Sequence, residues 1–430
     1  MPEASTPPKR LRPVTRTNAG LSRREFFERA AIASVGVPSL GALLQACSRS
    51  SRSSPTPHAS LTLAAPDHPV SWPISARNEP IADGLTPERN ATLKLYNYAD
   101  YIAPAAIKSF EKKYAKYGVK VSVSTFNDAD EALTKVRSAS APYDIYFPSY
   151  DQISKLVSGN LIRPLNHSYI TNIANVWAAF ANPWYDGKWR YTVPYTVYTT
   201  GIGWRTDRVK TNIANLPNPY DTLWDPKYRG QTGVIDDWHT TMAMTLLRKG
   251  ITDVNTDKPA DLNVISKQLS DLSKTTSPKV TVTMYNDLPA GQLGQTQMWS
   301  GDIVNAVSYL PKGTSPKVLR YWFPSDGKGL VDNDLMVVLR GGKNPVLSHL
   351  FLQHMLDTKV SLSNFSFIGY QPPQRAINPD SLVSQGYLPS NLAAAVVKEE
   401  YFSVGYRLLE LSPANDAAWH KIWLAYKAGS

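Results

Sequence analysis

An alternation of strand-like and helix-like segments between residues 93 and 147 limits the possible folds of this chain more than any other feature. Residues 119–124 (VKVSVS) alternate apolar and polar side chains, which is typical of a β-strand with one buried face. Helix-like segments flank this strand at about 104–117 and 129–138. Because strands that alternate with helices usually join through right-handed crossovers, the sequence predicts an α/β fold with a mainly parallel sheet.

Aromatic and acidic side chains follow the predicted strands of this region. Residues 95–101 (LYNYADY) end a strand with several rings and one carboxylate, and Ser149 follows the strand at 143–147. In parallel sheets ligands bind beyond the carboxyl ends of the strands. Aromatic faces attract organic cations by about 0.5 to 2 kcal/mol each, and a carboxylate adds a charge-assisted hydrogen bond. The segment is suited to bind such a cation, although tyrosines at a strand edge also serve as core residues.

A second carboxylate pair stands at the end of another predicted strand. Residues 232–235 are strand-like, and Asp236 and Asp237 separate them from a helix-like segment at about 238–249. The start of a helix needs a capping side chain, and aspartate is one of the preferred residues there. One aspartate is therefore expected to cap the helix, which leaves the other for a ligand.

Length and charge limit the class of protein. A chain of 430 residues has room for two domains, and an apolar share of 42% is that of a folded globular protein. The net charge of +11 could suggest a nucleic-acid partner, but residues 1–46 alone hold seven Lys and Arg against three acids. Elsewhere no basic run interleaved with aromatic residues stands out, so the sequence predicts no nucleic-acid binding.

The N-terminal region has the pattern of an export signal. Arg23 and Arg24 form a twin-arginine pattern, and the uncharged stretch at 30–46 is interrupted by glycine and proline. A membrane span needs about 20 strongly apolar residues, so this stretch is better explained as a signal segment. Residues 44–47 (LQAC) resemble a bacterial lipobox, which makes Cys47 the predicted lipid attachment site. The alternative is a buried structural cysteine.

These patterns divide the N-terminal part of the chain. Residues 1–46 are predicted to be a twin-arginine lipoprotein signal peptide, and residues 47–90, rich in Ser and Pro, a flexible tether. The protein is therefore expected to be exported, either lipid-anchored at the outer face of the cytoplasmic membrane or periplasmic. Because Cys47 is the single cysteine, an intrachain disulfide is excluded.

Five short motifs occur in an order and spacing that resemble one protein family. They lie at residues 95–101, 143–149, 194–195, 223–230 and 368–372. From about residue 91 to its end the chain resembles the bacterial spermidine/putrescine-binding proteins, which are the substrate-capturing subunits of ABC polyamine importers. The resemblance implies a polyamine ligand, permease subunits as partners, a monomer and no cofactor.

The same resemblance implies a two-lobed periplasmic-binding-protein fold of type II. Each lobe would hold a mixed, mainly parallel sheet with flanking helices, and two crossings would join the lobes. The ligand would lie in the cleft between them, and hinge closure would enclose it. Lobe one would comprise residues 91–197 and 331–380, and lobe two residues 198–330 and 381–430.

In that family aromatic rings sandwich the methylene groups of the polyamine, and acids bind its ammonium groups. Carried onto this chain, the resemblance implies that each lobe contributes rings and at least one carboxylate. The ligand-binding residues that it implies are Tyr98, Asp100, Tyr101, Ser149, Asp237, Trp299, Asn333 and Tyr370.

Several positions depart from the family pattern. Thr240 stands where a second acid is expected, Val331 where a tryptophan is expected, and Asp151 where an aromatic residue is expected. A site less acidic and less aromatic than a typical spermidine site is therefore predicted.

Asn333 also departs from the pattern, because it aligns with an ammonium-binding aspartate and is flanked by Asp332 and Asp334. A slip of one residue in a strand reverses the face to which each side chain points. Which of these three residues faces the ligand therefore stays open.

Two other classes of protein fit the sequence less well. An exported enzyme is disfavoured because the chain lacks His-Glu-x-x-His, Gly-x-Ser-x-Gly, a phosphate loop and paired cysteines at metal spacing. Its seven histidines are scattered, and His239 beside Asp237 is the suggestive neighbour. An adhesive surface lipoprotein would be expected to show internal repeats. The sequence therefore predicts a binding protein and no enzyme, with another small organic ligand as the alternative to a polyamine.

Overall fold

The computed structural model describes residues 62–138 and 143–429 of the chain. The predicted signal peptide, with Arg23, Arg24 and Cys47, lies outside the described residues, as does the first part of the predicted tether. The second part of that segment packs against the body. Trp72 is 4% exposed and its Nε1 donates a hydrogen bond to the carbonyl of Tyr185 at 2.8 Å. These residues are therefore bound to the body and are not a flexible tether.

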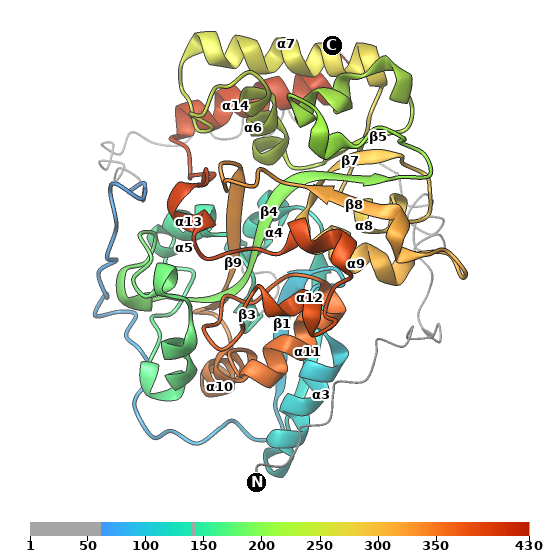
Figure 1. Ribbon diagram of the computed structural model, residues 1–430. Helices are drawn as coiled ribbons and strands as arrows, with labels where there is room; N and C mark the ends of the chain where they lie inside the picture. Colours follow the sequence, from blue (N-terminus) through green and yellow to red (C-terminus); the bar gives the residue numbers. More distant parts are fainter. Residues whose placement is uncertain (1–61, 139–142, 430) are drawn as a thin grey trace, which may run out of the picture. The chain divides into compact units, whose positions relative to one another are not determined.

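The described residues form a nine-stranded sheet with helices packed against it (Figure 1). The strands are β1 (Thr92–Tyr98), β2 (Lys120–Phe126), β3 (Ile145–Tyr146), β4 (Thr192–Arg205), β5 (Thr232–Ile235), β6 (Lys279–Thr281), β7 (Gln295–Trp299), β8 (Leu319–Trp322) and β9 (Leu330–Val338). The helices are α3 (Pro104–Lys113), α4 (Ala129–Arg137), α5 (Ile153–Ser158), α6 (Trp238–Arg248), α7 (Pro259–Thr276), α8 (Met284–Asp287), α9 (Ser300–Ala306), α10 (Pro345–Met355), α11 (Thr358–Ile368), α12 (Ser381–Ser384), α13 (Tyr401–Val404) and α14 (Pro413–Lys427).

The order of the strands explains how two halves arise within this sheet. The order is β2-β1-β3-β9-β4-β7-β5-β6, and β8 pairs with β4 outside this path. The pairs of β1 with β2 and β3 are parallel, as are those of β5 with β6 and β7. The central strands β4 and β9 are antiparallel to each other and to their neighbours. We call the two parallel parts the β1 end and the β5 end.

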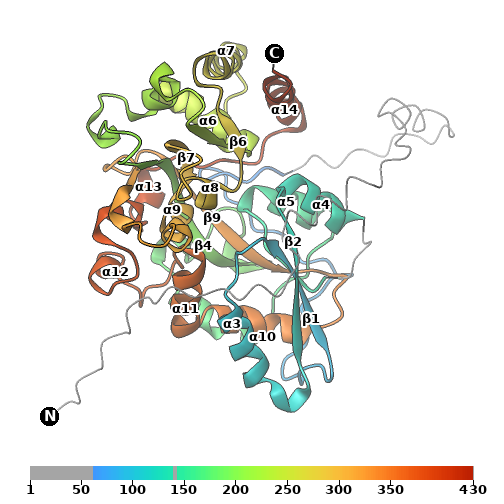
Figure 2. The same cartoon turned by 90° about the vertical axis from the view of Figure 1, so that its right-hand side faces the viewer.

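The predicted alternation of strands and helices is confirmed at the β1 end, where β1, α3, β2, α4 and β3 follow one another. The N-terminus of α4 is capped by Asp128, whose side chain accepts a hydrogen bond from the amide of Glu131. Proline begins α3 and α10, where its missing N–H leaves no helical hydrogen bond unmade. Both helices pack together beneath the β1 end (Figure 2), and Phe110 and Phe351 meet there at 5.0 Å between ring centroids.

Strands β4 and β9 run through both halves of the sheet. The 14-residue β4 pairs with β9 over its first part and with β7 and β8 over its second part. Strand β9 pairs with β3 near its carboxyl end. These two long strands therefore join the β1 end to the β5 end.

The C-terminal part of the chain touches both halves. Phe402 packs on Phe180 near the β1 end, with ring centroids 4.9 Å apart. Residues 405–411 then run beside β9, where the amide of Val331 donates to the carbonyl of Tyr406 at 3.0 Å. Helix α14 ends the chain against α6 and α7 at the other end of the sheet (Figure 1), where Trp419 is fully buried.

Candidate ligand-binding site

Four tyrosine rings meet where β1 ends and β4 and β9 cross between the halves. Tyr98 and Tyr101 lie edge to face with centroids 5.7 Å apart, and Tyr101 and Tyr370 do so at 4.8 Å. Tyr198 on β4 contacts Tyr370 at 5.6 Å. Edge-to-face packing is a favoured arrangement of aromatic rings because the positive edge of one meets the negative face of the other. We call Tyr98, Tyr101, Tyr198 and Tyr370 the tyrosine cluster.

Asp334 is the carboxylate of the tyrosine cluster. The hydroxyl of Tyr101 donates to its Oδ2 at 2.7 Å, and the hydroxyl of Tyr198 donates to its Oδ1 at 3.3 Å. Asp334 is 6% exposed. Burial raises the pKa of Asp334 to about 7, although the two hydroxyls oppose the rise and the charge of Asp332 adds to it. The group is thus an acid held in low-dielectric surroundings by neutral donors.

Asn333 lies in different surroundings from Asp334. It is fully buried, and its Nδ2 donates to the hydroxyl of Tyr185 at 3.1 Å. Its Oδ1 accepts a hydrogen bond from Nη2 of Arg407 at 2.6 Å. Both the oxygen and the nitrogen of the Asn333 amide therefore bond to residues outside the tyrosine cluster. The sequence left open which of Asp332, Asn333 and Asp334 faces the ligand, and Asp334 is the one that contacts the tyrosine cluster.

The β5 end contributes Asp237 and Trp299. The Oδ1 of Asp237 accepts a hydrogen bond from the amide of Thr240 at 2.8 Å and so caps α6. Burial raises the pKa of Asp237 to about 6, and its charge helps raise the pKa of Tyr98. Trp299 ends β7, and its ring lies 6.3 Å from that of Tyr198. Both residues therefore lie near the rings from the β1 end.

The neighbouring Asp236 has a different partner. Its carboxylate accepts hydrogen bonds from Nζ of Lys427 at 2.7 and 3.0 Å. The expectation that one of the two aspartates caps the helix is met by Asp237, which does so through one oxygen. Asp236 instead ties α14 to the β5 end.

Ser149 and Asp151 form a further acidic element. The Ser149 hydroxyl donates a short hydrogen bond to Oδ1 of Asp151. Burial raises the pKa of Asp151, and its charge raises the pKa of Asp237 and Asp334. Asp151 thus places a carboxylate near Asp237 and Asp334, and the expectation of a less acidic site stays a prediction.

Tyr370 is fixed by two glycines and an acid. Helix α11 ends at Ile368 and is followed by Gly369, whose φ of +79° suits glycine. The Tyr370 ring then packs on Gly301, where an added Cβ would stand 2.2 Å from the ring. Its hydroxyl donates to Oδ1 of Asp302 at 2.8 Å. Such contacts hold the ring in one orientation against Tyr101.

Asp100 lies apart from the other acids. It is exposed, its φ is +57°, and its Oδ2 accepts a hydrogen bond from the hydroxyl of Tyr309 at 3.5 Å. This contact again joins the β1 end to the β5 end, but at an exposed edge. A role of Asp100 in ligand binding stays a prediction.

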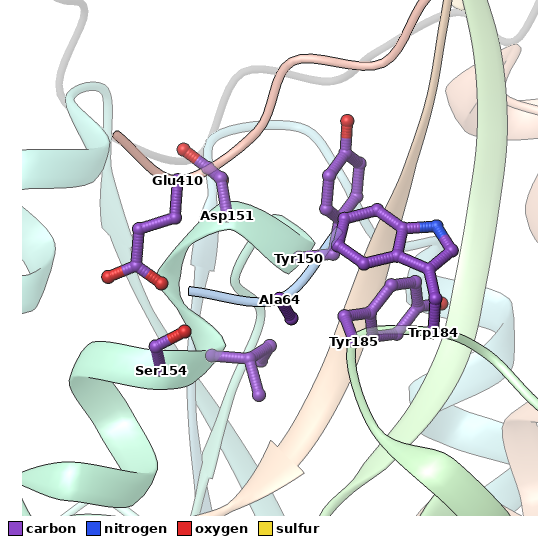
Figure 3. Close-up of a pocket in the computed structure, with 8 residues that line it drawn as sticks. Ala64, Tyr150, Asp151, Ser154, Trp184, Tyr185 and Glu410 are labelled. Atoms are coloured by element: carbon purple, nitrogen blue, oxygen red, sulfur yellow. The ribbon is translucent and has the colours of Figure 1, made fainter. Parts of the chain in front are cut away.

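A small pocket adjoins Tyr150 and Asp151 (Figure 3). Rings line one side of it and the carboxyl groups of Asp151 and Glu410 lie on the other. Burial raises the pKa of Glu410 to about 7. The residues that line the pocket are Ala64, Tyr150, Asp151, Ile153, Ser154, Trp184, Tyr185 and Glu410.

Tyr198 was not predicted as a site residue, although the sequence contains a pattern that indicates it. Thr196, Tyr198 and Thr200 alternate along β4 and share one face, so Tyr198 could have been placed beside the ligand by its period of two. Trp184, Arg407 and Glu410 carried no such signal, because they reach the site from loops far away in the chain.

His239, the suggestive histidine, is a core residue. Its ring stacks on that of Trp238, with centroids 4.7 Å apart, and it is 5% exposed. Burial lowers the pKa of His239 to about 3, so the ring is neutral at ordinary pH. Within residues 62–138 and 143–429, no group of three or more His, Cys, Asp or Glu is arranged to hold a metal ion.

In the part of the chain that the structure describes, no helix has the length and apolar character that crossing a membrane requires.

Comparison with known proteins places the fold among solute-binding proteins. The chain is 25% identical to the spermidine/putrescine-binding periplasmic protein of Escherichia coli over 288 residues, which is 67% of this chain and 79% of that protein. It is 25% identical to the putrescine/cadaverine-binding protein of Pseudomonas aeruginosa over 351 residues, 78% of this chain and 93% of that protein.

Solved structures agree with the arrangement of strands and helices. The substrate-binding protein of a spermidine/putrescine ABC transporter from Streptococcus pneumoniae superposes with a TM-score of 0.63 at 23% identity, covering 79% of this chain and 99% of that one. The predicted type II periplasmic-binding-protein fold is thereby confirmed. Residues 105–387 match the description of a bacterial extracellular solute-binding protein. The chain therefore belongs to the family of bacterial extracellular solute-binding proteins.

Proposed function

We propose that this protein captures a polyamine of the putrescine or spermidine type between the halves of its sheet and delivers it to the permease subunits of an ABC importer. The observation that carries the proposal is Asp334, a buried carboxylate held by the hydroxyls of Tyr101 and Tyr198. An ammonium group would give this acid the counter-charge that neutral hydroxyls do not supply.

The charges around Asp334 support a ligand with more than one cation. The charge of Asp151 helps raise the pKa of Asp237, and burial is the main cause of the raised pKa of both acids. Among the described residues, no Lys or Arg comes within 4.0 Å of the carboxylates of Asp151, Asp237 or Asp334. Buried carboxylates without counter-ions are costly, and a flexible dication would relieve that cost.

The rings support an organic cation over an inorganic one. Tyr98, Tyr198 and Trp299 offer faces to methylene groups next to an ammonium, each contact worth about 0.5 to 2 kcal/mol. The relatives named above bind spermidine, putrescine or cadaverine according to their names. The ligand-binding residues of this chain would be those eight that the sequence implies, with Asp334 in place of Asn333 and with Asp151 and Tyr198 added.

Calorimetric titration tests the proposal. The full chain, carrying Cys47→Ser to prevent lipid attachment, is titrated with putrescine, cadaverine, spermidine, glutamate and glucose. Heat and a rise in melting temperature are expected with the polyamines and not with glutamate or glucose. Absence of both signals with every polyamine would contradict the assignment, and binding of a different amine would move it to that cation.

Export and anchoring complete the proposal. The protein would leave the cytoplasm folded, guided by Arg23 and Arg24, and would act as a monomer held by a lipid on Cys47. Labelling of cells with a radioactive fatty acid should mark the wild-type protein and not Cys47→Ala. Replacement of both arginines by lysine should leave the protein in the cytoplasm. Equal labelling of the alanine variant would remove the lipid anchor from the proposal.

A further inference from the structure

One cation is already present beside the proposed polyamine site, and it belongs to the chain. The Arg407 guanidinium lies 4.5 Å from the ring centroid of Tyr150, 5.0 Å from that of Phe402 and 5.9 Å from that of Trp184. Its side chain is 9% exposed. These are the distances at which aromatic faces hold a cation.

The same guanidinium pairs with an acid of β9. Its Nε approaches Oδ1 of Asp332 at 4.0 Å, and its Nη2 donates to Oδ1 of Asn333 at 2.6 Å. The hydroxyl of Tyr150 donates to the same Oδ1 of Asp332 at 2.5 Å. Asp332 is thus held by a ring hydroxyl and a cation, in surroundings of the kind that a polyamine ammonium would occupy.

This arrangement is continuous with the tyrosine cluster. Asp332 and Asp334 are two positions apart on β9, so they lie about 7 Å from each other along the strand. The two carboxylates also interact electrostatically, because the charge of Asp332 raises the pKa of Asp334. Tyr150 and Trp184 also line the pocket that Asp151 joins. Arg407 therefore stands at one end of the same acidic and aromatic region.

Given the proposed function, on which this step rests, we infer that Arg407 is a built-in cation that closes one end of the site and selects short diamines over longer polyamines. A third ammonium reaching toward Asp332 would meet the guanidinium and would have to displace it from Asp332 and Tyr150. Two positive charges at such a short distance repel each other strongly in a buried site. With Asp332 already paired with Arg407, the acids that remain for the ligand are Asp151, Asp237 and Asp334, and Asp332 is not free to bind a third ammonium at the Arg407 end.

The path of the chain explains why Arg407 is there. Residues 405–411 run beside β9, with the amide of Tyr406 bonded to the carbonyl of Gly329 at 2.8 Å. This backbone contact fixes the position of Arg407 next to Asp332 without using its side chain. A substitution of Arg407 therefore changes the charge at this end of the site while the main-chain contacts of the segment stay in place.

The test is a chain-length series on wild type and on Arg407→Gln, using the full chain with Cys47→Ser. Wild type is expected to bind putrescine and cadaverine about tenfold or more tighter than spermidine and spermine. In Arg407→Gln the ratio should shift toward spermidine by about tenfold or more, because Asp332 and the rings of Tyr150 and Trp184 become available to a third ammonium.

Two further variants serve as controls. Arg248→Gln removes a guanidinium that lies 4.1 Å from the ring of Trp224 and bonds to Asp221 at 2.7 Å, outside the site. It should leave the putrescine-to-spermidine ratio unchanged. Arg407→Lys keeps the charge and should retain the wild-type preference. If Arg407→Gln does not fold, the chain-length series on wild type still tests the inference.

The outcomes separate this inference from the proposed function. Wild type that binds spermidine as tightly as putrescine would overturn the inference and leave polyamine capture standing. An equal change for all chain lengths in Arg407→Gln would overturn it as well. Absence of binding of any polyamine to wild type and to both Arg407 variants would instead remove the proposed function together with the inference.

Discussion

Two neighbouring regions of the site use the same types of residue and differ in one charge. Around Asp334, tyrosine hydroxyls hold a buried carboxylate beneath aromatic rings, and no cation of the described residues forms an ion pair with it. Around Asp332, the hydroxyl of Tyr150 holds a similar carboxylate, but Arg407 is present beside it and lies over three aromatic rings. The chain has thus filled one of two similar environments with its own guanidinium.

The pKa values of Asp332 and Asp334 reflect the presence or absence of Arg407. Burial raises the pKa of Asp332 to about 6, and the first influence that opposes the rise is the charge of Arg407. Burial raises the pKa of Asp334 to about 7, and only neutral hydroxyls oppose it. A folded protein seldom keeps a buried carboxylate without a counter-charge unless function requires it. The comparison indicates that the Asp334 region is kept ready for a cation from outside.

The largest effect on binding is expected from Asp334→Asn. Removing one member of a buried, hydrogen-bonded charge pair costs about 2 to 5 kcal/mol, so the affinity for putrescine should fall by about thirtyfold or more. The free protein should keep its melting temperature or gain a few degrees, because an uncompensated buried acid has been removed. Calorimetry and thermal unfolding at about pH 8 check both results.

The matched control for that variant is Asp236→Asn. Asp236 pairs with Lys427 and lies outside the tyrosine cluster, so its loss should leave the affinity within about twofold of wild type. Unchanged binding by Asp334→Asn would mean that the ligand is held by other acids, and the contrast with Asp332 would lose its meaning.

Asp332→Asn should show the opposite pattern. Arg407 would lose its carboxylate while staying buried, and breaking a buried ion pair in this way costs about 3 kcal/mol of unfolding free energy. The putrescine affinity should change by less than about tenfold, since the diamine is expected at Asp334. Urea unfolding measures the first effect, with Asp253→Asn, from the exposed pair with Lys258, as a control that stays within about 0.5 kcal/mol. A variant as stable as wild type would show that the Asp332–Arg407 pair is not a fixed part of the fold.

A smaller effect is expected from the ring of the β5 end. Trp299→Ala removes one aromatic face near Tyr198 and should weaken putrescine binding by about tenfold, or about 1.4 kcal/mol. Trp299→Phe keeps a face and should lose less than about threefold. Equal losses in the two variants, measured by calorimetry, would indicate that Trp299 supports α9 and does not contact the ligand.

The sequence predicted the fold well because its signal is local. The period of two in β2 and the helices on either side of it are properties of short segments, and α/β topology follows from their order. Tyr98 and Tyr101 could likewise be placed, since they lie at or just after the end of a strand, whereas Asp237 was named through the family resemblance.

The choice among Asp332, Asn333 and Asp334 could not be predicted from the sequence. The pairing of β4 and β9 shifts register between Pro194 and Thr196, beside Asp334. A bulge of this kind changes which face each following residue takes, and its position is set by packing.

Arg407 was missed for a different reason. It lies 74 positions from Asn333 in the chain, and their contact depends on a segment that returns past β9 after α13. Nothing in the local pattern of residues 405–411 records that path. Charges that complete or occupy a site from such distances become visible only with the fold.

The pH dependence of binding is another effect of about tenfold, and it separates the two acids by titration. The pKa of Asp334 is raised from 3.8 to about 7. Between about pH 4 and pH 7, this carboxyl group is therefore protonated in the free folded protein and ionised in the unfolded chain. Stability of the free protein should therefore decrease as pH rises through this window. Binding has the opposite sign, because an ammonium prefers the ionised carboxylate: affinity should rise about tenfold from about pH 6 to about pH 8, with release of a proton. Calorimetry in two buffers of different ionisation enthalpy counts that proton, and Asp334→Asn should abolish most of the release, whereas Arg407→Lys should keep it. An affinity that does not change between about pH 6 and pH 8 would mean that Asp334 is already ionised in the free protein. The Asp334 region and the Arg407 region would then differ by less than one charge.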